Sequence, residues 1–182
     1  CGLTRAGLHE PSFLRFIRGN LICQEHLPAE PHIVASLEMR APRMVLHVRD
    51  PRAALVSWVH HVNTINSKGH IVAILQGVEC RLPDDYFNRS VVDQLAWQVD
   101  HFLPTTSNWI SRWMDIAHSG SSGLQIMVTN YTDLASDGRA LLSRILDFYQ
   151  IKYQPDWIKL PKPETGKWNY RAGKTVDWRD AY

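Results

Sequence analysis

The chain has 182 residues, 45% of them hydrophobic, and its 20 lysines and arginines nearly balance 18 aspartates and glutamates for a net charge of +2. A charge this close to neutral excludes a dedicated nucleic-acid binder, which carries a strong positive excess. No apolar run approaches the roughly 18 residues of a membrane-spanning helix. The length suits one hydrophobic core, so we expect a single domain over residues 1–182.

The hydrophobic pattern predicts alternating helices and strands. Short apolar runs have the length of buried strands, whereas stretches with a helical period predict helices. In chain order the predicted elements are a helix over 12–22, a strand over 21–23, a helix over 33–40, a strand over 44–48, a helix over 51–63, an irregular connection over 64–84, helices over 90–102 and 105–117, a strand over 124–129, a helix over 136–149 and a last helical turn at the end. This alternation is typical of an α/β protein with a parallel sheet.

The segment from Met44 to Trp58 is the most informative part of the chain. Its apolar strand ends at Arg49, after which Asp50 suits the N-cap and Pro51 the first position of a helix that carries Ser57 two turns on. Open α/β sheets bind ligands beyond the carboxyl ends of their strands, and an arginine and a hydroxyl beside a helix N-terminus suit a phosphate. The plainer alternative is a solvated arginine before a capped helix.

This segment resembles the 3′-phosphate-binding signature of sulfotransferases that use 3′-phosphoadenosine-5′-phosphosulfate (PAPS), with Arg49 and Ser57 at the family's spacing. Three other segments resemble family motifs in the same order. Residues 24–28 (Gln-Glu-His-Leu-Pro) resemble the segment of the catalytic histidine, residues 130–134 (Asn-Tyr-Thr-Asp-Leu) resemble a segment whose tyrosine lies against the nucleotide, and residues 171–179 (Arg-Ala-Gly-Lys-Thr-Val-Asp-Trp-Arg) resemble the loop that closes over the cofactor. The resemblance covers roughly residues 20 to 182.

The resemblance implies a three-layer α/β fold of the P-loop NTPase-like sulfotransferase architecture, with a mostly parallel sheet flanked by helices. It implies transfer of a sulfuryl group from PAPS, leaving adenosine 3′,5′-bisphosphate (PAP), to a hydroxyl or amine of a small-molecule or glycan acceptor, without a metal. It implies His26 as the general base, a task that suits a neutral imidazole near pH 7. The cofactor-binding residues that it implies are Arg49, Ser57, Tyr131, Arg171, Gly173 and Lys174.

Two departures from the family pattern keep other interpretations open. The family opens with a strand, a phosphosulfate-binding loop and a helix that have no counterpart here, so we expect the chain to be a fragment of a longer protein. Ala172 and Val176 also stand where the family has lysine and glycine. The alternatives are a non-catalytic nucleotide-binding domain and another P-loop-type group transferase, such as a small-molecule kinase. Plainer roles for His26 and Tyr131 are a loop-capping histidine and a core aromatic.

Three cysteines, Cys1, Cys23 and Cys80, are too few for a disulfide framework and favour a reducing, cytoplasmic location. A Cys23–Cys80 bridge in the secretory pathway stays open as an alternative. The adjacent His60 and His61 predict no metal site, because neighbouring helical residues point in different directions. The sequence specifies neither the acceptor nor the oligomeric state.

Overall fold

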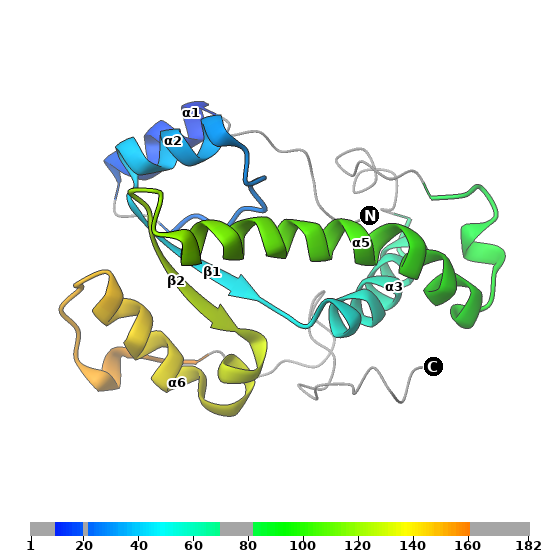
Figure 1. Cartoon of the computed structure of the whole chain (residues 1–182). Coiled ribbons are helices and arrows are strands. Elements are labelled where there is room, and N and C mark those ends of the chain that lie inside the picture. Colours follow the sequence, from blue (N-terminus) through cyan, green and yellow to red (C-terminus); the bar gives the residue numbers. More distant parts are fainter. Residues whose placement is uncertain (1–9, 20–21, 70–81, 161–182) are drawn as a thin grey trace.

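The computed structural model describes residues 10–19, 22–69 and 82–160. In this part of the chain, helices surround two parallel strands (Figure 1). The elements in chain order are α1 (Glu10–Arg18), α2 (Pro31–Arg40), β1 (Arg43–Val48), α3 (Pro51–Ser67), η1 (Tyr86–Asn88), α5 (Val91–Ser119), β2 (Gln125–Asn130), α6 (Tyr131–Phe148) and η2 (Pro155–Trp157). The α/β class and the parallel pairing predicted from the sequence are confirmed.

The two strands run in register from Arg43 opposite Gln125 to Val48 opposite Asn130. Because successive residues of a strand point to opposite faces, the sheet has two distinct surfaces. The surface that contains Leu46 is apolar and packs against α1, α2 and the second half of α5. The opposite surface carries polar pairs and lies on the side of α6, so the sheet is a layer between helices (Figure 1).

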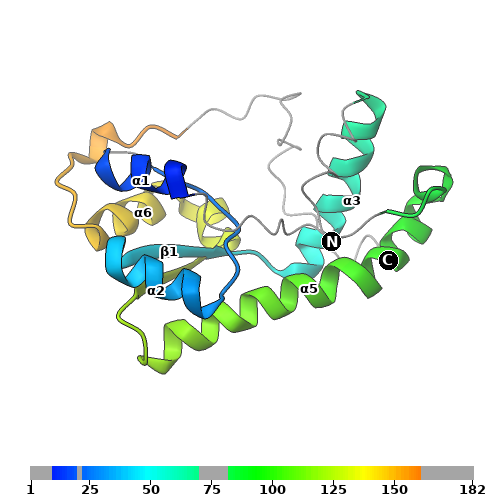
Figure 2. The same ribbon diagram turned by 90° about the horizontal axis from the view of Figure 1, so that it is seen from above.

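The core around the sheet is built from one or two large side chains of each surrounding element. Phe13 of α1, Ile33 and Leu37 of α2, Leu46 of β1 and Trp113 of α5 each expose 7% or less of their surface. Two further apolar clusters lie between α3 and the first half of α5 and include η1. Their members that expose 2% or less of their surface are Leu55, Val56, Val59, Val62, Tyr86 and Leu95. The helix α5 therefore belongs to both cores (Figure 2).

The helix ends follow from local capping chemistry. Asp50 accepts a hydrogen bond from the Arg52 backbone N–H at 2.9 Å, and Pro51 takes the first helical position of α3, as predicted. Ser90 caps α5 by accepting from the Asp93 backbone N–H at 3.1 Å. Gly120 ends α5 with a φ of 60°, a left-handed conformation that glycine adopts without strain.

Several predicted element boundaries are wrong. The helices expected over 90–102 and 105–117 are one helix that continues through Pro104. Burial of Phe102 and Thr106 on either side of the proline keeps the chain helical, and α5 bends part-way along its length, as helices do at an interior proline (Figure 1). No strand forms at residues 22–23, which lie in an irregular segment.

The last helix, α6, begins at Tyr131 rather than at residue 136. Asn130 caps this earlier start by accepting from the Asp133 backbone N–H at 2.8 Å. Asp137 interrupts the helix with a φ of −149° and a ψ of 82°, and its side chain accepts from the Ala140 backbone N–H. Ser136, where the sequence predicted the helix to begin, therefore lies next to this kink and not at the start of α6. Among the described helices, none is long and apolar enough to cross a membrane.

Candidate functional site

The carboxyl ends of the two strands bring together two of the predicted cofactor-binding residues. Arg49 follows β1 and Tyr131 follows β2, and each lies one position beyond the last pair of the parallel register. The guanidinium carbon of Arg49 lies 4.5 Å from the centre of the Tyr131 ring. At this distance the cation and the ring face attract each other.

Arg49 is half-buried, and its Nε is a buried donor with no hydrogen-bond partner among the described residues. Other arginines differ in this respect, because Arg52, Arg89 and Arg112 each pair with a carboxylate. A buried N–H without an acceptor is destabilising, so an anion bound here would satisfy it.

Two helices begin beside this pair, because α3 follows β1 and α6 follows β2 directly (Figure 1). Their N-termini add partial positive charge to that of Arg49. Ser57 lies two turns into α3, partly buried, and no hydrogen bond joins it to Arg49 or Tyr131 in the described chain. The geometry therefore supports an anion site at Arg49, with Ser57 farther along the helix.

His47 lies on the same face of the sheet as Arg49, two residues earlier in the chain. Its Nδ1 and Oγ1 of Thr129 are hydrogen-bonded across the strands at 2.9 Å. Burial lowers the pKa of His47, and the Asp133 carboxylate on α6 opposes this shift only in part. Our sequence analysis missed this residue, which stands out only once strand pairing places it beside Thr129.

The predicted base, His26, lies in an irregular segment over residues 22–30 that α5 holds in place. The indole N–H groups of Trp109 and Trp113 both donate to the Leu27 backbone carbonyl, at 2.7 and 2.9 Å. Between them, Arg112 donates to the Ala29 carbonyl at 3.0 Å and pairs with the Glu30 carboxylate at 2.9 Å. We call these three residues of α5 the α5 clamp.

The His26 side chain is exposed, and its ring centre lies 6.2 Å from that of Trp109. From the sequence, the helical spacing of Trp109 and Trp113 predicts that both are core residues. Trp113 is indeed buried, yet both also hold the backbone next to His26. The spacing of residues 109, 112 and 113 predicts a shared helix face, but only the fold shows what that face contacts.

The comparison with protein families bears on this arrangement. A family model described as "Sulfotransferase domain" matches residues 6–163, which is most of the chain. The chain belongs to the sulfotransferase domain family. The comparisons with curated proteins and with solved structures found no match.

The match confirms the resemblance seen in the sequence, and it includes the segments of His26, Arg49, Ser57 and Tyr131. It ends before Arg171, Gly173 and Lys174, and these three lie outside the described residues, as does Cys80. Within the described ranges of this sulfotransferase domain, no three histidines, cysteines, aspartates or glutamates are grouped so as to hold a metal.

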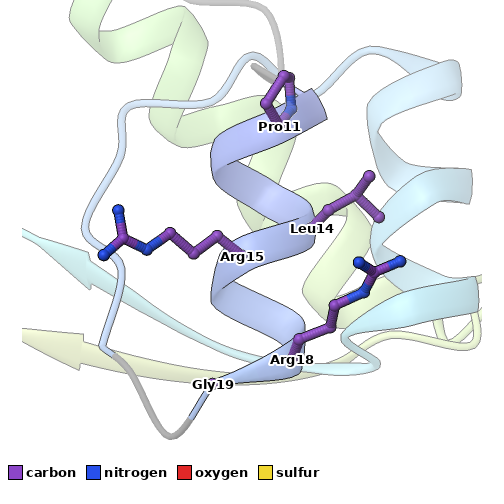
Figure 3. Close-up of a pocket in the computed structure, with 5 residues that line it drawn as sticks. All are labelled: Pro11, Leu14, Arg15, Arg18 and Gly19. Atoms are coloured by element: carbon purple, nitrogen blue, oxygen red, sulfur yellow. The ribbon is translucent and has the colours of Figure 1, made fainter.

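A shallow, open depression on the surface of this sulfotransferase domain lies away from these residues. It is lined by Pro11, Leu14, Arg15, Arg18 and Gly19, all in or directly after α1 (Figure 3). Its lining is mostly apolar and includes none of the predicted site residues. We therefore place the candidate site at the carboxyl ends of the strands, because Arg49 and Tyr131 lie there, and not at this depression.

Proposed function

We propose that this sulfotransferase domain moves a sulfuryl group from PAPS to a hydroxyl or amine of a small-molecule or glycan acceptor and leaves PAP as the product. The observation that supports this most is Arg49, a half-buried cation at the carboxyl end of a parallel strand, whose Nε has no hydrogen-bond partner in the part of the chain that the structure describes. This is where open α/β sheets bind ligands, and a guanidinium can contact two phosphate oxygens at once.

In this proposal, Arg49 and Ser57 bind the 3′-phosphate of the nucleotide, together with Arg171, Gly173 and Lys174. Tyr131 lies at the same end of the sheet. Residues at these positions hold the nucleotide in place for the reaction. Positioning and charge stabilisation then contribute most of the catalysis, as they do in phosphoryl transfer.

His26 is the proposed general base. Its imidazole accepts the proton of the acceptor hydroxyl or amine as the new bond to sulfur forms. PAPS supplies the activated sulfuryl group, whose bond to the phosphate oxygen breaks in the same transfer. The α5 clamp supports this role, because it holds the backbone of the segment that carries His26.

The test is a calorimetric titration of PAP into the protein and two arginine variants. We expect Arg49→Ala to weaken PAP binding by about tenfold to a hundredfold, because it removes charged hydrogen bonds to phosphate. Arg89→Ala is the matched control, since Arg89 is paired with Asp85 at 2.9 Å, and should leave the affinity unchanged.

Equal affinities of the protein and Arg49→Ala for PAP would contradict the proposed function, and so would absence of PAP binding by a protein that includes the expected upstream phosphosulfate-binding loop. PAP binding without transfer from PAPS to any acceptor would instead favour the alternative of a non-catalytic nucleotide-binding domain.

A further inference from the structure

We propose that Tyr131 is a positioning residue that acts through Arg49: its ring holds the guanidinium in place for the phosphate. The inference rests on the proposed function, because the phosphate in question belongs to PAP. It assigns Tyr131 a different role from the direct contact with the nucleotide that the family resemblance implies.

The first support is the geometry of the two side chains. The guanidinium of Arg49 lies over the face of the Tyr131 ring, 4.5 Å from its centre. The face that receives the guanidinium is not available for stacking against a nucleotide base. An aromatic ring and a guanidinium in this arrangement attract each other electrostatically, and more strongly where water is partly excluded.

The second support is that the backbone fixes the ring. Tyr131 is the first residue of α6, and the Asn130 side chain caps that helix at 2.8 Å. Asn130 is also the last residue of β2, paired with Val48. Tyr131 therefore lies between the end of β2 and the capped start of α6. Arg49, which follows Val48, lies directly across from it.

The third support is that no other described residue restrains the Arg49 side chain through a hydrogen bond or an ion pair. Within the described ranges, its Nε has no hydrogen-bond partner and no carboxylate forms an ion pair with it. A long side chain without a partner samples many rotamers and loses this freedom when it binds a ligand. A ring that already restricts the guanidinium lowers this loss, so it strengthens phosphate binding without touching the phosphate.

A double-mutant cycle on PAP affinity tests the inference. We expect Tyr131→Leu to weaken PAP binding by about threefold to thirtyfold, the range of a cation–ring contact. Tyr131→Phe keeps the ring and should restore most of the affinity. In the Arg49→Ala background, Tyr131→Leu should have no further effect, because the residue through which it acts is gone. A loss of equal size in both backgrounds would overturn the inference and assign Tyr131 a direct contact.

Tyr153→Leu is the matched control, since Tyr153 is a partly buried tyrosine in the segment between α6 and η2. It should leave the affinity unchanged. Melting temperatures of all variants, measured without PAP, separate a loss of folding from a loss of binding.

A second measurement needs neither PAP nor a variant. In the nuclear magnetic resonance spectrum of the unmodified protein, the Nε–H proton of Arg49 should be shifted upfield by the ring current of Tyr131. An unshifted signal would overturn the inference. A shifted signal from a protein that fails to bind PAP would overturn the proposed function and leave the pairing of Arg49 with Tyr131 intact.

Discussion

At the scale of single residues, the end of β1 presents two basic side chains with different charge states. The guanidinium of Arg49 is a cation. His47 lies on the same face, two residues earlier, and burial lowers its pKa, so it is neutral near pH 7. Its hydrogen bond with Thr129, which is 1% exposed, keeps the ring against β2. The end of β1 therefore presents one positive charge, that of Arg49, beside a neutral imidazole.

This charge state predicts a dependence of stability on pH. The pKa of His47 is lower in the folded protein than in the unfolded chain, so the unfolded state binds the proton more readily. Stability should fall as the pH drops below the unfolded value near 6.5 and should level off below the folded pKa. His47→Gln, which does not titrate, should reduce this fall in the free energy of unfolding, measured with urea at about pH 7.5 and about pH 5.

The His47 variant should not abolish the fall entirely. Burial also lowers the pKa of His61, so this second histidine contributes a loss of the same sign. The Asp133 carboxylate, which faces His47 from α6 and pairs with Arg144 at 3.7 Å, limits the size of the effect. Identical pH profiles for the protein and His47→Gln would show that His47 titrates normally in the folded state.

At the scale of elements, α5 supplies hydrogen-bond donors to the backbone of the segment over residues 22–30. This segment has no helix or strand of its own, so its backbone groups need partners elsewhere. The α5 clamp provides three donors to two carbonyls, from side chains one helical turn apart. A regular element thus positions an irregular segment, which is a common way to place functional residues on loops.

Substitution of Trp113 tests the clamp. Trp113→Phe removes one of the two indole donors to the Leu27 carbonyl and leaves a smaller ring in a site that is 1% exposed. We expect the free energy of unfolding to fall by about 2–3 kcal/mol, from lost packing and a lost hydrogen bond. Urea unfolding followed by far-ultraviolet circular dichroism measures it.

Trp157→Phe is the control for this substitution. Trp157 is 63% exposed, so the same change of side chain should cost less than about 0.5 kcal/mol. If both variants lost a similar free energy of unfolding, the burial and the hydrogen bond of Trp113 would contribute nothing to stability.

At the scale of the whole molecule, one helix joins two hydrophobic cores. The first half of α5 packs against α3, and the second half packs against the sheet with α1 and α2 (Figure 2). Each core contains side chains of α5, so unfolding of this helix would expose apolar residues of both cores. We therefore expect the two parts to unfold together in one transition.

Leu46→Ala tests this coupling. Leu46 is 2% exposed in the core around the sheet, and its truncation should cost about 2–5 kcal/mol. Circular dichroism, dominated by the helices, and tryptophan fluorescence should report the same lowered midpoint in urea. Leu134→Ala, at a position 38% exposed, should shift the midpoint much less. Separate transitions for the two probes would show that the cores unfold independently.

Much of the fold could be predicted where the relevant signal is local. The structure has a strand and a helix where the apolar run of β1, the cap at Asp50 and Pro51 predicted them. These three signals are close neighbours in the chain. Local signals failed where packing overrode them. The sequence predicted two helices over 90–102 and 105–117, but the buried side chains on both sides of Pro104 keep α5 continuous.

The residues and their order were enough to recognise the sulfotransferase family, because the motifs are short and contiguous. They were not enough to show that Arg49 lies over Tyr131 or that α5 holds the segment of His26. Both contacts join residues far apart in the chain. Strand register and helix placement depend on how all the apolar faces pack at once, so these contacts exist only in the folded molecule.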